Sequence, residues 1–347
     1  MASLCLESMW AQKLVKLGWS ERAVAQFPLC LAKSTLDSYN RQIRNLARFC
    51  ADNKCDFPDC DVPTIVDFLC SVADSSSRPH SQIKMALAAI GHLFKCLDLP
   101  DVCSDPMVTM MVQALVKSGT SVPRKRSEVL PVAQLMDLFT SWPSNDLLDV
   151  KRLRIKAITL LALSTMLRPS DVAPKGQLFN PVSLTSEQMV FSTDNLTFND
   201  DGSLTILFHG IKNDSDRSGF EVNLPPAGDP MLDPVTTLQC YISATASQRA
   251  DSHDKQSSPV FIGLCRPYKA LSSTSIGLIL KEVTVRAGLQ GFSARSFRPT
   301  GATRAIDLGF DAEKIRRLGR WKTSGVFFEH YVHSKPPQDY TDAVLRD

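Results

Sequence analysis

Helical periodicity in the first 120 residues restricts the fold of this chain more than any other feature of its sequence. In "LDSYNRQIRNLARFCADN", apolar residues recur every three or four positions, and Ser34 and Thr35 precede the segment as candidate helix caps. Three more segments, "VPTIVDFLCSVADS", "HSQIKMALAAIGHLFKCLDLP" and "SDPMVTMMVQALVKSG", are bounded by Pro, Gly or Ser. The pattern predicts a bundle of about four or five helices over residues 1–120.

A polar and basic segment, "SGTSVPRKRSEVLP", follows the predicted bundle, and we assign residues 121–131 to an interdomain linker. Its basic run contains Arg124, Lys125 and Arg126. This run is compatible with phosphate contacts, with a nuclear-import patch, or with a solvated tether. The sequence leaves these alternatives open.

Helical and alternating patterns are mixed from residue 132 to residue 335. "DVKRLRIKAITLLALSTML" is mostly apolar after its basic start and predicts a buried helix. In "SLTSEQMVFST" and "SLTILFHGIKNDSDRSGFEVNLPPA", apolar and polar residues alternate, which predicts a hairpin or small antiparallel sheet. Later segments return to helical spacing. We therefore expect a mainly α protein with one small antiparallel β-sheet.

Composition excludes several classes of protein. The 347 residues are 44% apolar and 22% charged, without eighteen consecutive apolar residues or a secretory signal, so we expect a soluble intracellular protein. A net charge of +3 means that any nucleic-acid surface must be local. The spacing of Cys50, Cys55, Cys60 and Cys70 does not suit tetrahedral zinc, so we expect thiols and no metal. Phosphate-loop, dinucleotide, metalloprotease and GxSxG signatures are absent.

Basic residues and one tyrosine remain as candidates for chemistry. Arg168 ends an apolar helix, where an ion needs an anionic partner, and Asp171 is one such partner. Lys212 falls at the tip of the predicted hairpin, where a solvated lysine is the ordinary interpretation. Arg295 and Arg298 lie three residues apart near a helix start, a spacing that lets both guanidinium groups face one anion. A tyrosine in the aromatic segment "GVFFEHYV" is compatible with simple core packing.

Taken in order, these segments resemble the tyrosine recombinases, or phage-type integrases. The matching motifs are "LRPSDV", "GIKND", "RSFRPTGATRA", "IRRLGRW" and "EHYV", spread over about 165 residues in the family's order. Each motif is short and weak by itself, but the occurrence of all five in the family's order makes the resemblance fairly specific. The short sequences "SFR", "GAT" and "GRW" within these motifs most resemble recombinases of eukaryotic mobile elements of the Crypton and DIRS type.

The resemblance implies a fold and a reaction. It implies a helical, SAM-like core-binding domain over 1–120 and a mixed α/β catalytic domain over 132–335, which together form a C-shaped clamp on DNA. Tyr331 would be the nucleophile that forms a 3′-phosphotyrosyl link, without metal, ATP or another cofactor. Arg168 and Arg298 would hold the phosphate oxygens, and Lys212 would protonate the leaving 5′-hydroxyl. Trp321 or Arg320 would fill the family's His/Trp position.

One departure from the family pattern concerns the His-x-x-Arg box. Arg295 replaces its histidine and cannot act as a general base at neutral pH. Deprotonation of Tyr331 would then depend on water, on a phosphate oxygen, or on a phenol pKa lowered by nearby cations. A recombinase-derived DNA-binding protein that has lost turnover is therefore the main alternative to an active enzyme, and a type IB topoisomerase fits less well.

Double-stranded DNA is the expected partner, and the nucleus is the expected location. The family works as a dimer on one site and a tetramer in synapsis, and residues 336–347 are the candidate segment for exchange between protomers. We assign contacts with DNA to seven basic side chains: Arg41, Arg44, Lys84, Arg124, Lys125, Arg126 and Arg304.

Overall fold

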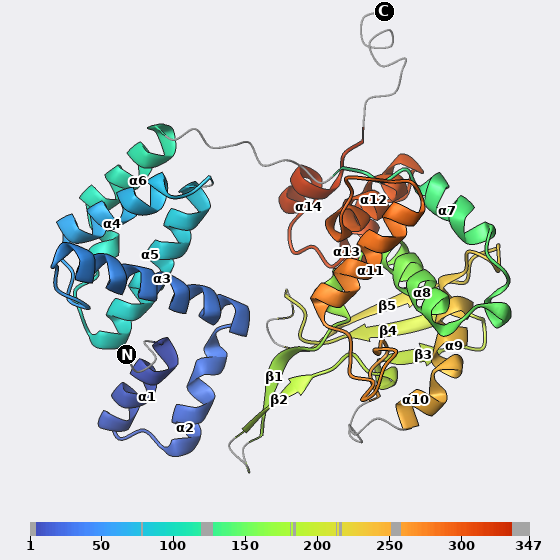
Figure 1. The fold of residues 1–347 in the computed structure, drawn as a ribbon, viewed down its shortest axis with the longest axis horizontal. Coiled ribbons are helices and arrows are strands. Elements are labelled where there is room, and N and C mark those ends of the chain that lie inside the picture. Colours follow the sequence, from blue (N-terminus) through green and yellow to red (C-terminus); the bar gives the residue numbers. More distant parts are fainter. Residues whose placement is uncertain are drawn as a thin grey trace, which may run out of the picture. The chain divides into compact units, whose positions relative to one another are not determined.

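The computed structural model describes residues 5–77, 79–118, 128–180, 182, 185–212, 214, 217–250 and 258–334, with the side chains of 175–180 and 185–188 undescribed. The chain divides into two compact units (Figure 1). The first contains residues 1–125 and 176–187, and the second contains 126–175 and 188–347. This division falls within the predicted linker, and it places 176–187 with the N-terminal residues. The linker's Arg124, Lys125 and Arg126 lie outside the described residues.

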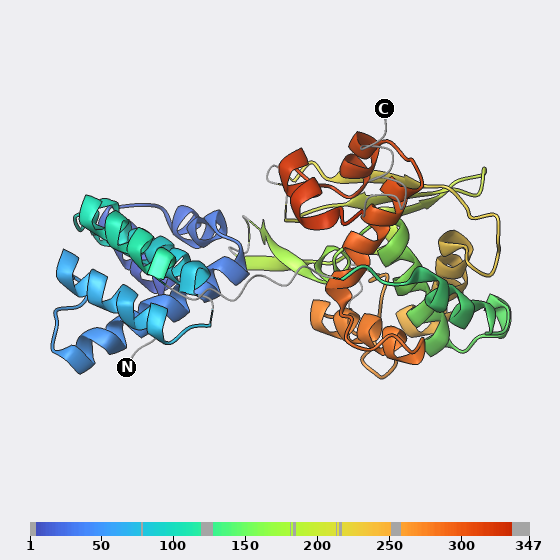
Figure 2. The ribbon, with the colours of Figure 1, turned by 90° about the horizontal axis from the view of Figure 1, so that it is seen from above.

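The first unit is a helical bundle (Figures 1 and 2). Its described part has six α-helices, where the sequence predicted four or five: α1 (Leu6–Lys16), α2 (Glu21–Gln26), α3 (Lys33–Asn53), α4 (Val62–Asp74), α5 (Pro79–Leu97) and α6 (Pro106–Ser118). Short 3-10 turns occur at Phe27–Cys30 and Val102–Ser104. None of the helices in the described part of the chain is long and apolar enough to cross a membrane.

Helix α3 follows the predicted periodicity, because Leu36, Ile43 and Leu46 are all buried in the core of the bundle. Its start differs from the prediction. The residue that precedes the helix is Ala32, so Ser34 and Thr35 lie within the first turn and do not cap it. In α4, Pro63 lies in the first turn, and Asp61 accepts a hydrogen bond from the Thr64 N–H at 2.9 Å.

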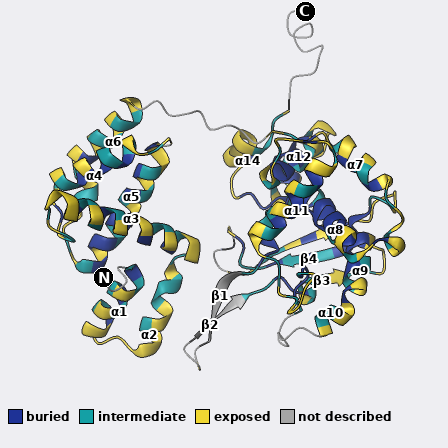
Figure 3. Cartoon of the chain, viewed as in Figure 1, coloured by how far each residue is buried: buried dark blue, intermediate teal, exposed yellow. Residues whose placement is uncertain are grey.

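The second unit combines helices with a sheet. Its helices are α7 (Val132–Thr140), α8 (Val150–Ser164), α9 (Pro234–Ala244), α10 (Ala246–Ala250), α11 (Ser273–Arg286), α12 (Ala294–Asp307), α13 (Ala312–Leu318) and α14 (Ser324–Tyr331). Side chains of Asp149, Asp233, Ser272, Ser293, Asp311 and Thr323 cap six of them at the N-terminus. The predicted burial of α8 is confirmed, and Figure 3 shows it as the darkest helix of this unit.

Three antiparallel strands form the sheet in the order β3 (Leu196–Phe198), β4 (Leu204–Phe208), β5 (Phe220–Leu224). Leu204, Ile206 and Phe208 of the central strand are buried, which confirms the predicted alternation. The "SLTSEQMVFST" segment behaves differently from the prediction. Its strand β2 (Thr185–Met189) pairs with β1 (Lys175–Asn180) in a separate two-stranded sheet. The sequence of β1, "KGQLFN", lacks the alternation that would have revealed this partner.

A second, smaller core lies at the C-terminal end of this unit. It consists of the buried side chains of Met166, Ala302, Ile315, Trp321 and Phe327, and the half-buried Tyr331 packs against it. This core joins the end of α8 to helices α12, α13 and α14. It is the part of the fold that positions the candidate site.

Candidate active site

Arg168 lies in the turn that follows α8. Its backbone N–H donates to Asp171 Oδ2 at 2.8 Å, which fixes the short 3-10 turn Pro169–Asp171. The Arg168 side chain is half-buried, and its buried Nη1 has no hydrogen-bond partner among the described residues. A guanidinium N–H in this state is available to bind an anionic oxygen.

Arg298 is almost fully buried on α12, with 3% of its surface exposed. Its Nη1 and Nη2 donate to the carbonyl oxygens of Met166 and Gly319, while its buried Nε has no partner in the described part of the chain. Burial, together with the neighbouring charges of Arg168 and Arg320, lowers the pKa of Arg298 to about 9. At neutral pH the group is still a cation, held in one orientation by two backbone carbonyls.

Arg320 and Trp321 are neighbours in the sequence but make separate contacts. Arg320, with φ +59°, is 2% exposed, and its Nη2 lies 3.3 Å from Asp171 Oδ2 in a buried ion pair. Its guanidinium also lies 4.4 Å from the centre of the Phe208 ring. The Trp321 ring instead lies 4.0 Å from the guanidinium carbon of Arg298. Of the two candidates for the family's His/Trp position, Trp321 is therefore the one that lies beside Arg298.

Tyr331 ends α14 and closes the cluster. Its ring lies 4.8 Å from the Trp321 ring and 5.3 Å from the guanidinium carbon of Arg298. Thr303 on α12 anchors this end of the helix, because its hydroxyl donates to the Tyr331 carbonyl and accepts from the His333 N–H. Burial raises the pKa of the Tyr331 phenol, but the charges of Arg168 and Arg298 outweigh burial, and the pKa is lower than that of an ordinary tyrosine.

Two glycines allow the cluster to close. A Cβ atom on Gly301 would lie 2.4 Å from the Leu163 carbonyl oxygen, so only glycine lets α12 approach α8 this closely. A Cβ atom on Gly319 would lie 1.7 Å from Trp321 Cζ3, so the indole occupies the space that a side chain would need. The glycines of the "GAT" and "GRW" motifs therefore have a packing role.

Lys212 lies in the loop between β4 and β5, as predicted, and its side chain is exposed. Two nearby residues, Ile211 and Asp214, are buried. Ile211 is buried in the main core of the second unit, and Asp214 is 7% exposed. The Asp214 carboxylate accepts hydrogen bonds from the N–H groups of Gly210 at 2.6 Å and Gly219 at 3.0 Å.

Arg295 does not join the cluster. It is exposed in the first turn of α12, and no described contact around Tyr331 involves it. The i,i+3 spacing therefore did not bring Arg295 and Arg298 to one anion site. Arg316 and Arg317 are also engaged elsewhere, because both pair with Glu313 on α13.

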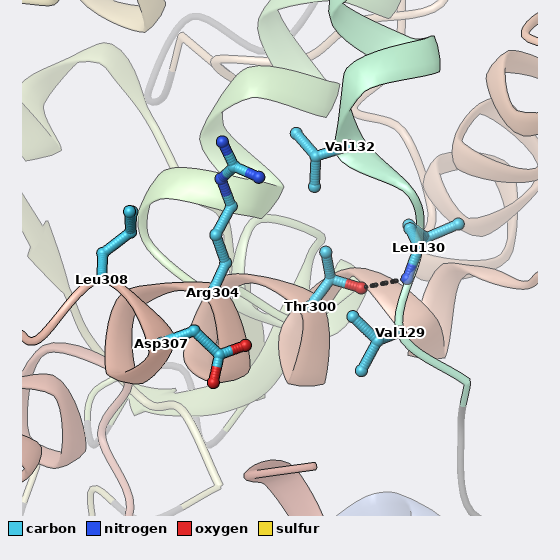
Figure 4. Close-up of a pocket in the computed structure, with 7 residues that line it drawn as sticks. All are labelled: Val129, Leu130, Val132, Thr300, Arg304, Asp307 and Leu308. Atoms are coloured by element: carbon cyan, nitrogen blue, oxygen red, sulfur yellow. Dashed lines mark hydrogen bonds between the residues drawn. The ribbon is translucent and has the colours of Figure 1, made fainter. Parts of the chain in front are cut away.

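The remaining predicted DNA contacts in the described residues are exposed cations. Arg41 and Arg44 lie on α3, and Lys84 lies on α5, all within the first unit. Arg304 lies on α12 and lines a pocket of about 220 Å³ with Asp307, Leu308 and three residues before or within α7 (Figure 4). In that pocket the Leu130 N–H donates to the Thr300 hydroxyl at 2.8 Å.

Sequence reasoning missed some of the contacts that the candidate residues and their neighbours make. Asp171 was considered only as a partner of Arg168, whereas its ion pair is with Arg320, 149 residues away. Thr303 stands next to Ala302 in "GAT", and nothing in its local pattern indicates that it holds the tyrosine helix. Asp214 lies two residues after Lys212 in the polar run "NDSDRSG", where its burial could not be anticipated.

Comparison with known proteins gives no match to a family model or to a curated protein sequence. Solved structures do match. The XerH site-specific recombinase in a pre-cleavage complex with difH substrate is 12% identical, with a TM-score of 0.57 over 100% of this chain and 91% of that one. The Tn1549 transposon integrase in complex with transposon right-end DNA is 10% identical, with a TM-score of 0.56 over 98% of each chain.

A lambda integrase dimer bound to a COC′ core site is 13% identical, with a TM-score of 0.53 over 95% of this chain and 77% of that one. At these identities the likeness shows the fold. The mainly helical chain with a small antiparallel sheet therefore has the tyrosine-recombinase fold, and the predicted fold class is confirmed.

Proposed function

We propose that this chain is a tyrosine recombinase that cuts and rejoins DNA strands at specific sites, with Tyr331 as its nucleophile. The observation that carries the proposal is the cluster formed by Arg168, Arg298, Trp321 and Tyr331, which come from four separate parts of the sequence. Two of its guanidinium groups keep a buried N–H without a described partner. The matched integrase and recombinase folds support the same proposal, because their structures hold DNA.

In the proposed reaction, the Tyr331 phenolate attacks the phosphorus of one phosphodiester. A bond forms between the phenolic oxygen and phosphorus, and the bond from phosphorus to the 5′-oxygen breaks. Lys212 gives a proton to that oxygen, and the 3′-phosphotyrosyl link keeps the energy of the broken bond. Attack by a 5′-hydroxyl on this link reverses the steps, so rejoining needs no ATP.

Arg168 and Arg298 would bind the non-bridging oxygens as negative charge grows in the transition state. Removing one such preorganised donor commonly costs about 2.7–4 kcal/mol in activation free energy. Trp321 has a buried indole N–H without a hydrogen-bond partner in the described residues, which suits it to donate to the same phosphate.

The proton of Tyr331 poses the main chemical problem, because Arg295 stands where the family has histidine. In our proposal the cations beside the phenol replace a dedicated base. Arg168 and Arg298 already lower the Tyr331 pKa in the absence of DNA. The phenolate is then formed by proton loss to water or to a phosphate oxygen.

DNA contacts of the first unit would come from one face of α3. Arg41 and Arg44 are three residues apart and exposed, so their side chains lie on neighbouring positions of one helix surface. Lys84 adds an exposed cation on α5, which packs against α3. Contacts of this kind bind phosphates of any sequence and should weaken as salt rises.

Three finer assignments belong to the same proposal. The "SFR", "GAT" and "GRW" motifs favour an element-borne recombinase of the Crypton or DIRS type. Assembly as a dimer on one site and a tetramer in synapsis, with exchange of residues 336–347, follows from the family resemblance, and these residues lie outside those the structure describes. The nucleus is the proposed location.

A suicide substrate tests the proposed activity. The protein is incubated with a pool of short nicked duplexes of randomised sequence, from which the cut fragment is lost by diffusion, so that any covalent adduct accumulates. Selection of adducts on a denaturing gel also recovers the target sequence. We expect adducts with the unaltered protein and none with Tyr331→Phe.

A recombinase-derived DNA-binding protein without turnover is the second candidate. The exposed position of Arg295, away from the cluster, favours it, because no described histidine replaces the missing base beside the Tyr331 phenol. Sequence-selective DNA binding without any adduct in the same assay would support this candidate over the enzyme.

A further inference from the structure

The loop that carries Lys212 has a charged anchor that the proposed chemistry does not use. Asp214 is 7% exposed, and each of its carboxylate oxygens accepts from a different backbone N–H. Oδ2 accepts from Gly210, which follows β4, and Oδ1 accepts from Gly219, which precedes β5. The carboxylate thus ties the two ends of the loop together.

Two more contacts involve Ile211, the residue before Lys212. The Asp214 N–H donates to the Ile211 carbonyl at 2.9 Å, which forms a tight turn around Lys212. Ile211 itself is 4% exposed and belongs to the main core. Both glycines have positive φ angles, +58° at Gly210 and +85° at Gly219, so the backbone at each end adopts a conformation that suits the carboxylate bridge.

Lys212 directly follows a residue buried in the core and lies two positions before a residue bonded to two backbone amides. A lysine side chain is long and flexible, and it can deliver a proton to one oxygen efficiently only if its backbone position is defined. We propose that Asp214 is a positioning residue that holds Lys212 for protonation of the leaving 5′-hydroxyl. This inference rests on the proposed function and assigns no contact between Asp214 and DNA.

The substitution Asp214→Asn tests the bridge with little change in volume. An amide has one acceptor oxygen and one donor NH₂ group, so one of the two glycine N–H groups would face a donor. The matched control is Asp201→Asn. Asp201 lies in the β3–β4 turn of the same sheet and accepts from the Ser203 N–H at 2.9 Å, but it is exposed and lies outside the loop that carries Lys212.

The readout compares two substrates of the sequence recovered by adduct selection. One has the normal 5′-oxygen at the scissile bond, and the other has sulfur in its place. A thiol has a pKa of about 8.5, so a thiolate leaves without a proton, whereas an alkoxide needs one. A defect that acts through the general acid should appear with oxygen and disappear with sulfur.

We expect Asp214→Asn to slow adduct formation on the oxygen substrate by about tenfold, which is less than the ~10²–10⁴-fold that a general acid contributes in full. Lys212→Ala should show a larger loss, sulfur should restore both variants, and Asp201→Asn should match the unaltered protein on both substrates. If Asp214→Asn does not fold, Asp214→Ser, which keeps one acceptor, takes its place.

Three results would count against the inference. An Asp214 variant that is equally slow on both substrates would make the residue structural only, and one as fast as the unaltered protein would make it dispensable. An unaltered protein that yields no adduct in the selection itself would overturn the proposed function and this inference with it. The first two results leave the proposed function intact.

Discussion

The guanidinium carbon of Arg298 lies 4.0 Å from the centre of the Trp321 ring. This cation–π contact connects helix α12 with the segment between α13 and α14, in addition to the hydrogen bond from Arg298 to the Gly319 carbonyl. It also holds the Trp321 indole between Arg298 and Tyr331, whose ring lies 4.8 Å away. The geometry of the proposed phosphate site therefore depends on the position of one aromatic side chain.

Gly319→Ala should displace that side chain. The added Cβ would lie 1.7 Å from Trp321 Cζ3, so the indole or the backbone must move, and we expect a loss of stability of about 1–3 kcal/mol, typical of overpacking. Denaturant unfolding measures the change. Gly325→Ala is the control, because no heavy atom lies within 4 Å of its Cβ position and alanine favours the helix by up to about 1 kcal/mol. Equal effects of the two variants would contradict the packing described.

Asp171→Ala should be strongly destabilising. The side chains of Asp171 and Arg320 are 2% and 0% exposed, so loss of the carboxylate leaves a buried guanidinium without its counter-ion, at a cost of about 3–5 kcal/mol. Urea unfolding of both proteins gives the difference. The exposed pair of Glu282 and Arg286 offers a comparison, and Glu282→Ala should change stability by less than about 1 kcal/mol. A small effect of Asp171→Ala would show that Arg320 is stabilised in another way.

Arg168 and Arg298, the two arginines proposed to bind the phosphate, should respond differently to substitution by alanine. Arg168→Ala should lower the unfolding free energy less than Arg298→Ala does, because its buried Nη1 has no described partner, yet it should slow adduct formation by about 10²–10³-fold. Arg298→Ala should impair both, because it also removes the bonds to the Met166 and Gly319 carbonyls. Unfolding and adduct kinetics on the same preparations separate the effects. Full activity of Arg168→Ala would show that Arg168 does not bind the phosphate in the reaction.

Tyr331 should ionise at lower pH than an ordinary tyrosine. Because its folded pKa is lowered, ionisation favours the folded state, and the stability gained at high pH is lost as pH falls through that lowered pKa. Ultraviolet titration without DNA detects the phenolate. The Tyr331→Phe variant should lack the first-ionising phenol, whereas buried Tyr241, whose pKa is raised by burial, should ionise late. In Arg168→Ala the Tyr331 transition should move to higher pH.

The fold was largely readable from the sequence where periodicity is strong. Helix α3 has an apolar face along its length, and buried residues alternate with more exposed ones along strand β4. Each pattern is therefore compatible with one type of secondary structure. Strand β1 is short, and its apolar and polar residues do not alternate. Its pairing with β2 therefore cannot be recognised from the local sequence.

The candidate site was readable as a set of residue types, but its internal contacts were not. Arg320 and Trp321 are adjacent, and only the left-handed backbone at Arg320 sends one side chain to Asp171 and the other to Arg298. Arg295 occupies the histidine position of the His-x-x-Arg motif, yet it is exposed. The buried residues in the first turn of α12 are Ser296 and Phe297. Such outcomes depend on packing between distant segments, which spacing along the chain does not specify.

Mapping the covalent link tests the central claim most directly. Adducts selected from the nicked duplex pool are digested with protease and nuclease, and the modified peptide is sequenced by mass spectrometry. The account predicts a nucleotide attached through a 3′-phosphate to Tyr331, within the peptide that contains "GVFFEHYV". A link to another residue, or DNA bound at a selected site without any link, would contradict it.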